Sequence, residues 1–174
     1  GSLLSSEIIS AKSLSEVALE TVGRNLTKEL GIRTFINAAG TYTSMTGSLM
    51  HKEVTSAISY GASEFVNLDE LHDRVGDRIA ELLDCEYATV SSGAFGAMSI
   101  GLAGVISGMD TKKVAQLPDT TGLKNEVIVQ KGHNIGYTHA LTNVGAKLVF
   151  VESAKELKKA INKNTAMLWF LNAN

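Results

Sequence analysis

Residues 89 to 98 read Thr89-Val90-Ser91-Ser92-Gly93-Ala94-Phe95-Gly96-Ala97-Met98, an apolar run that turns abruptly into a helix through small residues. Such a turn exposes free backbone N–H groups at the positive end of the helix dipole, and a glycine lets an anion approach the backbone. The segment therefore predicts a phosphate-binding turn, although small residues also serve simply to let a helix pack close to a sheet. It has neither the Gly-Lys-Ser/Thr end of a nucleotide loop nor the G-x-G-x-x-G of a dinucleotide fold.

Around this turn the chain alternates between short apolar runs and helical patterns. The apolar runs predict buried strands over residues 87–90, 127–129, 147–151 and 166–171. The helical patterns cover residues 13–30, 52–60, 69–83, 94–107, 137–143 and 154–161. This alternation predicts an α/β fold with a mainly parallel sheet and helices on both faces. Ligands of such sheets lie beyond the carboxyl ends of the strands, so functional residues are expected after residues 90, 129 and 171. A long polar connection over residues 108–126 is typical of a functional or mobile loop.

Composition limits the class of protein. A chain of 174 residues with 44% apolar residues and a net charge of -2 suits a single soluble domain and lacks the clustered cations of a nucleic-acid interface. It contains no apolar stretch long enough for a membrane span. The single cysteine, Cys85, cannot form an internal disulfide, which favours a reducing cytoplasm. Gly1 and Ser2 are typical of residues left by tag removal and are set aside.

Other polar residues are candidate ligands. His133 follows the second predicted strand, on the rim expected to carry the phosphate turn, where an imidazole could stack on an aromatic ligand or transfer a proton; a solvated loop histidine is the alternative. No metal site is predicted at Asp69, Glu70, His72 and Asp73, because Glu70 points about 100° away from the face that Asp69 and Asp73 share. Acidic residues are also ordinary in the first turn of a helix. His51, which precedes a predicted helix, is interpreted as a surface residue, and Cys85 as structural rather than nucleophilic.

Four segments, in this order, give the chain a family likeness: residues 36–41 (Ile-Asn-Ala-Ala-Gly-Thr), 91–97, 117–126 (Leu-Pro-Asp-Thr-Thr-Gly-Leu-Lys-Asn-Glu) and His133. From Ile32 to Asn174 the chain resembles pyridoxal-phosphate (PLP) enzymes of fold type I. Within them it resembles the selenocysteine-synthase-like branch that includes D-glucosaminate-6-phosphate ammonia-lyase-type proteins. The resemblance implies residues 1–31 as an N-terminal helical arm and residues 32–174 as the first part of the PLP-binding large domain.

The resemblance also implies residue roles. Backbone amides of Gly93, Ala94 and Phe95 would hold the phosphate of PLP, supplemented by the Ser92 hydroxyl, and His133 would lie over one face of the pyridine ring. The substrate side and the cofactor edge would be lined by Thr41, Thr43, Ser44, Asn172 and Asn174. The aspartate that pairs with the pyridinium nitrogen and the Schiff-base lysine follow, in the family, the segment where this sequence stops. No catalytic residue is therefore assigned, and we expect a fragment that is inactive by itself.

The implied function is part of a PLP-dependent lyase or transferase. It would act by β-elimination or replacement on an amino acid or a phosphorylated amino-sugar acid, in a homodimer or larger assembly. One alternative is a non-catalytic oligomerisation or binding module whose helix 13–30 packs on a partner. Another is a dinucleotide-dependent oxidoreductase, which the missing glycine fingerprint disfavours.

Overall fold

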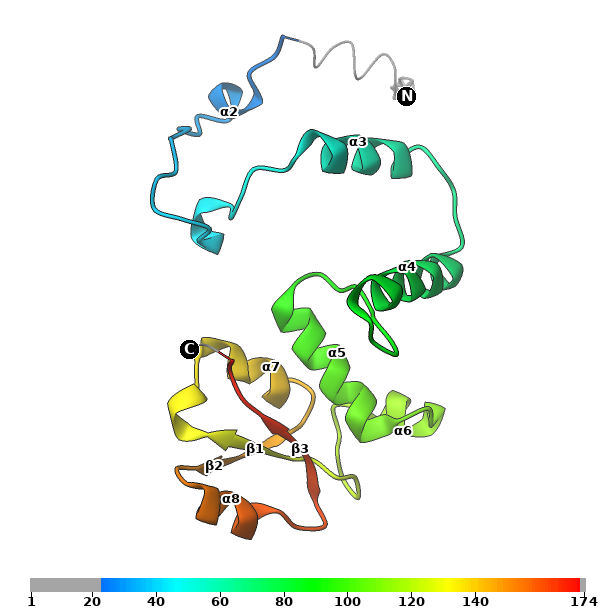
Figure 1. Cartoon of the computed structure of the whole chain (residues 1–174), viewed down its shortest axis with the longest axis vertical. Helices are drawn as coiled ribbons and strands as arrows, with labels where there is room; N and C mark the ends of the chain where they lie inside the picture. Colours follow the sequence, from blue (N-terminus) through cyan, green and yellow to red (C-terminus); the bar gives the residue numbers. More distant parts are fainter. Residues whose placement is uncertain (1–22, 173–174) are drawn as a thin grey trace, which may run out of the picture. The chain divides into compact units, whose positions relative to one another are not determined.

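The computed structural model describes residues 23–172, which fall into two units divided between Glu64 and Phe65 (Figure 1). The predicted boundary after residue 31 stays a prediction, because most of the proposed arm, and most of the predicted helix 13–30, lies in residues 1–22, outside the described range.

The described part of the first unit contains short helical elements. They are α2 (Leu26–Glu29), the 3-10 turn η1 (Thr43–Met45) and α3 (Lys52–Gly61). Asn25 caps α2, since its side chain accepts a hydrogen bond from the Lys28 amide at 2.9 Å. Helix α3 confirms the helix predicted over residues 52–60, and none of its residues is buried.

The second unit is built on a parallel sheet. Its elements are α4 (Leu68–Leu83), α5 (Ala94–Ser107), α6 (Thr111–Gln116), β1 (Glu126–Gln130), η2 (Lys131–His133), η3 (Gly136–Thr138), α7 (His139–Thr142), β2 (Lys147–Val151), α8 (Ala154–Ala160) and β3 (Thr165–Trp169). The strand order is β2-β1-β3, and β1 pairs in parallel with both neighbours. The predicted α/β class and parallel pairing are confirmed. The helix predicted over residues 137–143 is divided into η3 and α7.

The core lies where β1 meets the helices. Val127 and Val129 are fully buried on one face of the sheet, in a cluster with Leu102 of α5 and Leu141 of α7. Burying each such side chain contributes about 1.5–3 kcal/mol. Ile128 is 1% exposed and faces the opposite side, because successive strand residues alternate. There, α8 lies on the side of the sheet away from α7 (Figure 1).

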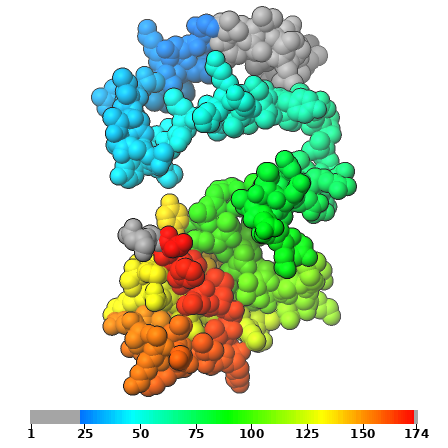
Figure 2. All heavy atoms as spheres, viewed as in Figure 1, coloured from blue at the N-terminus to red at the C-terminus, as the bar shows by residue number. Residues whose placement is uncertain are grey.

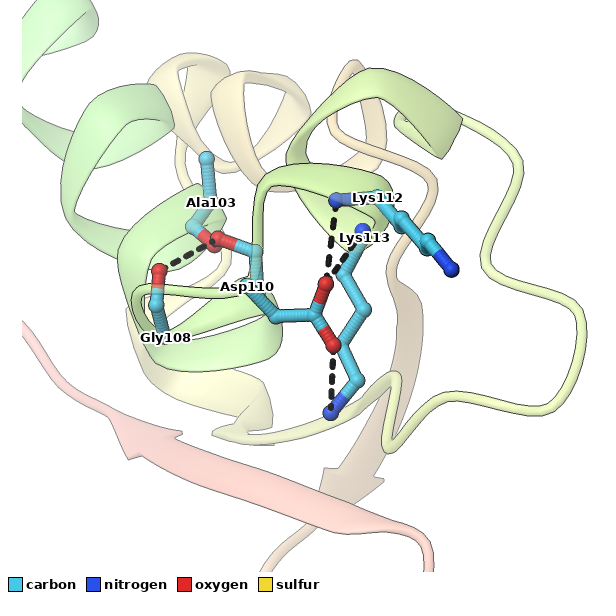
Figure 3. Close-up of polar contacts among 6 residues, drawn as sticks. Ala103, Gly108, Asp110, Lys112 and Lys113 are labelled. Carbon is cyan, nitrogen blue, oxygen red and sulfur yellow. Dashed lines mark hydrogen bonds and ion pairs between the residues drawn. The ribbon is translucent and has the colours of Figure 1, made fainter.

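Three hydrogen bonds mark the end of α5 and the start of α6 (Figure 3). The Ser107 hydroxyl donates to the Ala103 carbonyl at 2.8 Å, and the Asp110 carboxylate accepts the Lys112 and Lys113 amides at 3.0 and 3.4 Å. Asp110 is thus the N-cap of α6, a helix that lies within the predicted polar connection 108–126. The capping aspartate was the local signal for it.

The strand predicted over residues 87–90 was wrong. These residues form no strand, and Tyr87 is 89% exposed. A strand requires a hydrogen-bonded neighbour, and within residues 23–172 no segment pairs with this one. The segment instead passes close to α4, where a Cβ on Gly76 would lie 2.5 Å from the Ala88 carbonyl oxygen.

The third strand is also shorter than predicted, because β3 ends at Trp169 and leaves Phe170 and Leu171 outside it. It is an edge strand of the sheet, and the space-filling view shows it, in red, at the surface of this unit (Figure 2). Leu168 and Phe170 are exposed there.

The connection between α6 and β1 is fastened to the turn before β2. The Thr120 hydroxyl donates to the Gly145 carbonyl at 3.0 Å and accepts from the Asn125 amide group at 2.7 Å. Gly145 has a φ of +92° and lies so close to this connection that a Cβ there would sit 2.0 Å from the Pro118 carbonyl oxygen. The residues interpreted as a functional or mobile loop thus pack at the amino ends of the strands.

Candidate functional site

The predicted phosphate turn forms the start of α5. Gly93 is the N-cap residue, with φ 108° and ψ 177°, and no side chain caps the helix. A Cβ built on Gly93 would meet nothing within 4 Å, and the residue itself is exposed. Uncapped helical amides beside an exposed glycine are donors of the kind that bind a phosphate group such as that of PLP.

Two serines shape this turn. The Ser91 hydroxyl donates to the Gly93 carbonyl at 3.0 Å, and the Ser92 hydroxyl lies 3.2 Å from where a Cβ on Gly96 would stand. Ser92 is exposed and Ser91 half-buried. No separate role was predicted for Ser91, yet its hydrogen bond to Gly93 stabilises the turn. The Ser92 hydroxyl lies against the first turn of the helix.

His133 lies at the carboxyl end of β1, as the last residue of η2, and is half-buried. Its Nδ1 accepts a hydrogen bond from the Leu171 backbone N–H at 3.1 Å. Leu171 follows β3, so the imidazole connects the ends of two neighbouring strands. A contact between residues so far apart in sequence has no local signal.

The topology opens a crevice at the end of β1. The connection from β1 to β2 and that from β2 to β3 cross the sheet in opposite directions, so right-handed crossovers place α7 and α8 on opposite faces. Connections that leave neighbouring strands toward opposite faces leave a crevice between the strand ends. A pocket of about 460 Å³ lies there, lined by Gln130, Lys131, Gly132, His133, Val151 and Glu152.

An ion pair crosses this crevice. Lys131 Nζ lies 2.6 Å from Glu152 Oε1. The hydrogen bond from Lys131 lowers the pKa of Glu152, and the same contact raises the pKa of Lys131, with a smaller contribution from Glu156. Both side chains therefore stay ionised at neutral pH, and Lys131 carries its proton.

A ring contact joins the phosphate turn to the segment that follows His133. The Phe95 ring, in the first turn of α5, packs on His139 at the start of α7, with centroids 4.6 Å apart and planes tilted by 54°. One turn further along α5, the Ser99 hydroxyl donates to the Ala140 carbonyl at 2.9 Å. Helices α5 and α7 are thus tied together at the end of α5 that carries Gly93.

The remaining predicted site residues lie elsewhere. Thr41, Thr43 and Ser44 belong to the first unit, where η1 begins at Thr43, and all three are exposed. Asn172 follows β3 and is exposed, while Asn174 lies outside the described residues. Their substrate-side roles stay predictions.

Within residues 23–172, no three His, Cys, Asp or Glu side chains come together in an arrangement that could hold a metal ion. Asp69 and Glu70 occupy the first turn of α4, which Asn67 caps. Cys85 is exposed. No helix in the described part of the chain combines the length and the apolar character needed to cross a bilayer.

Comparison with known proteins confirms the resemblance to D-glucosaminate-6-phosphate ammonia lyase, over about 40% of the length of that enzyme. The chain is homologous to D-glucosaminate-6-phosphate ammonia lyase of Salmonella typhimurium (strain 14028s / SGSC 2262). The two are 32% identical over 159 residues, which is 86% of this chain and 43% of the relative. A solved structure of a D-glucosaminate-6-phosphate ammonia-lyase matches with a TM-score of 0.78 and 33% identity, over 84% of this chain and 42% of that one.

A second curated relative has a different activity. The 5'-C-glycyluridine monooxygenase-decarboxylase of a Streptomyces species is 28% identical over 156 residues, covering 84% of this chain and 39% of the relative. The chain thus spans less than half the length of the relatives it matches. No family model matches it.

Proposed function

We propose that this chain is the part of a PLP-dependent lyase that binds the cofactor phosphate and faces one side of the cofactor ring. The observation that carries the proposal is the uncapped start of α5 at Gly93, an exposed glycine whose side-chain position is unobstructed. The backbone amides of Gly93, Ala94 and Phe95 would bind the phosphate, the Ser92 hydroxyl would supplement them, and His133 would face the ring.

The two relatives suggest that the matched part of each protein binds the cofactor, while the rest determines which reaction is catalysed. One is named as an ammonia lyase and the other as a monooxygenase-decarboxylase, yet they match nearly the same length of this chain. What they have in common with it is therefore a scaffold that serves more than one reaction. Bound PLP supplies an electron sink for carbanion chemistry. This chain's residues would bind and orient it.

The higher identity to the ammonia lyase favours elimination of ammonia from an amino-sugar acid as the activity of the whole protein. A phosphorylated amino-sugar acid would be the substrate, with Thr41, Thr43, Ser44 and Asn172 as candidates for its side of the site. We assign no lysine or aspartate contact with the cofactor within this chain.

Titration of the isotope-labelled chain with inorganic phosphate, followed by amide NMR, tests the proposal. Charge-assisted hydrogen bonds contribute about 1.5–3 kcal/mol each. The entropy lost on association cancels most of this binding energy. We therefore expect binding of about -4 kcal/mol, in the millimolar range, with shifts centred on Gly93, Ala94 and Phe95. Shifts at the lysines of α8, with none at Gly93, would reject the proposed site.

Matched aspartate variants separate the turn from general charge effects. Gly93→Asp should abolish the phosphate-induced shifts, because its carboxylate lies where the phosphate would bind. Gly122→Asp adds the same charge at another positive-φ glycine with open space around it and should leave binding unchanged. With PLP itself, the absorbance should disappear on dialysis; a retained band would mean that a lysine of this chain binds the cofactor covalently.

A further inference from the structure

The environment of His133 determines which ring nitrogen can carry a proton. A backbone N–H can only donate, so the contact from Leu171 at 3.1 Å requires a lone pair on Nδ1. An imidazolium has protons on both nitrogens and could not accept it. The ring is therefore neutral, with its proton on Nε2, as long as this hydrogen bond is kept.

The surroundings add no charge that would oppose this state. Lys131 from the end of β1 and Glu152 from the end of β2 line the same pocket as His133 and are paired with each other at 2.6 Å. Glu156 of α8 provides the Glu152 backbone N–H with an acceptor at 2.9 Å. The segment after β3, Phe170 to Asn172, has no ionisable side chain.

We infer that His133 serves the proposed cofactor site as a neutral imidazole protonated on Nε2, with its plane fixed by the Leu171 backbone N–H. Such a ring stacks on the cofactor ring and can donate a hydrogen bond from Nε2, but it does not abstract a proton. Leu171 is thereby a positioning residue that acts through its main chain. The inference rests on the proposed function for its ligand, and it assigns the removal of a substrate proton to a group other than His133.

The chain contains an internal reference with the opposite requirement. Nδ1 of His139 faces the Gly136 carbonyl oxygen, which can only accept, so Nδ1 of His139 carries a proton, whether the other nitrogen is protonated or not. Long-range proton–nitrogen NMR of the ligand-free chain at neutral pH shows which ring nitrogens are protonated. We expect His133 as the Nε2–H tautomer and a proton on Nδ1 of His139. A His133 that carries its proton on Nδ1, or that averages both forms, overturns the inference.

Substitutions at His133 test the contact with Leu171. In His133→Asn the side-chain oxygen stands near the position of Nδ1 and should keep the Leu171 amide protected from hydrogen exchange. In His133→Phe the flat ring remains but the acceptor is lost, and exchange of the Leu171 amide should accelerate by about two- to twelvefold. The amide of Val127 in β1 reports on the fold and should exchange at the same rate in both variants. Equal Leu171 exchange in the Phe and Asn variants, relative to Val127, overturns the inference.

The two proposals fail separately. Phosphate binding at Gly93 with the wrong His133 tautomer would reject this inference and leave the proposed function standing. The expected tautomer without any phosphate-induced shift at Gly93 would reject the proposed function instead.

Discussion

Replacing Gly145 with alanine should strongly destabilise the second unit. The φ of +92° is a conformation that L side chains rarely adopt, and this strain costs about 1–2 kcal/mol. The added Cβ would also lie 2.0 Å from the Pro118 carbonyl oxygen and 2.8 Å from Thr120 Cγ2, so the backbone must shift. Overpacking of this kind costs about 1–3 kcal/mol more. The expected loss is therefore about 2–5 kcal/mol.

Thermal and urea unfolding of the purified variants would measure the loss of stability in Gly145→Ala. A loss of about 3 kcal/mol would lower Tm by roughly 6–12 °C. Two alanine variants serve as controls. Gly122→Ala has a φ of +77° and no neighbour within 4 Å, so it should show the strain alone. Gly104→Ala, inside α5 with open space around it, should stabilise the helix by about 0.5–1 kcal/mol. If Gly145→Ala were no less stable than Gly122→Ala, the close approach to Pro118 would be refuted.

Three further predictions follow from local contacts. Asp110→Ala removes the cap of α6 and should cost about 0.5–2 kcal/mol in urea unfolding, while Asp110→Asn, which keeps an acceptor, should cost less. The side-chain and backbone hydrogen bonds from Thr121 lower the pKa of Asp119 below its ordinary value of 3.8. This carboxylate therefore stabilises the fold at any pH above 3.8, and the contribution is lost as the pH falls through the lower pKa of the folded state. Thr121→Ala should raise the pKa of Asp119 in an NMR titration, and Thr121→Ser should not. Light scattering should find a dimer or larger species, because apolar side chains such as Leu168 are exposed at the sheet edge; a monomer at high concentration would contradict this.

Local pattern was sufficient for elements whose ends are marked by particular residues. Helix α5 begins and ends where it was predicted, because Gly93 and Gly108 flank a continuous apolar run. Strand β2 also has its predicted bounds, 147–151. The apolar run 87–90 resembles these strands in sequence, but pairing depends on a neighbour that composition does not reveal. Helix α6 was missed because its six residues carry little apolar periodicity.

The sequence predicted single residues of the candidate site but not the contacts between them. The turn at Gly93 and the position of His133 after β1 follow from strand–turn–helix patterns. The contact of His133 with Leu171, and that of Phe95 with His139, join segments about 40 residues apart in the chain. Periodicity and turn chemistry are local, so they contain no information on such pairs.

The order β2-β1-β3 also has a consequence for how the unit folds. Glu126 pairs with Lys147 and with Thr165, about 20 and about 40 residues along the chain, and doubling a loop adds about 0.6 kcal/mol of closure entropy. Pairing of β1 with β2 should therefore precede the arrival of β3. Since Leu171 travels with β3, the histidine at the end of β1 would rotate freely until this last strand docks. The ring would become ordered in the same step that completes the sheet.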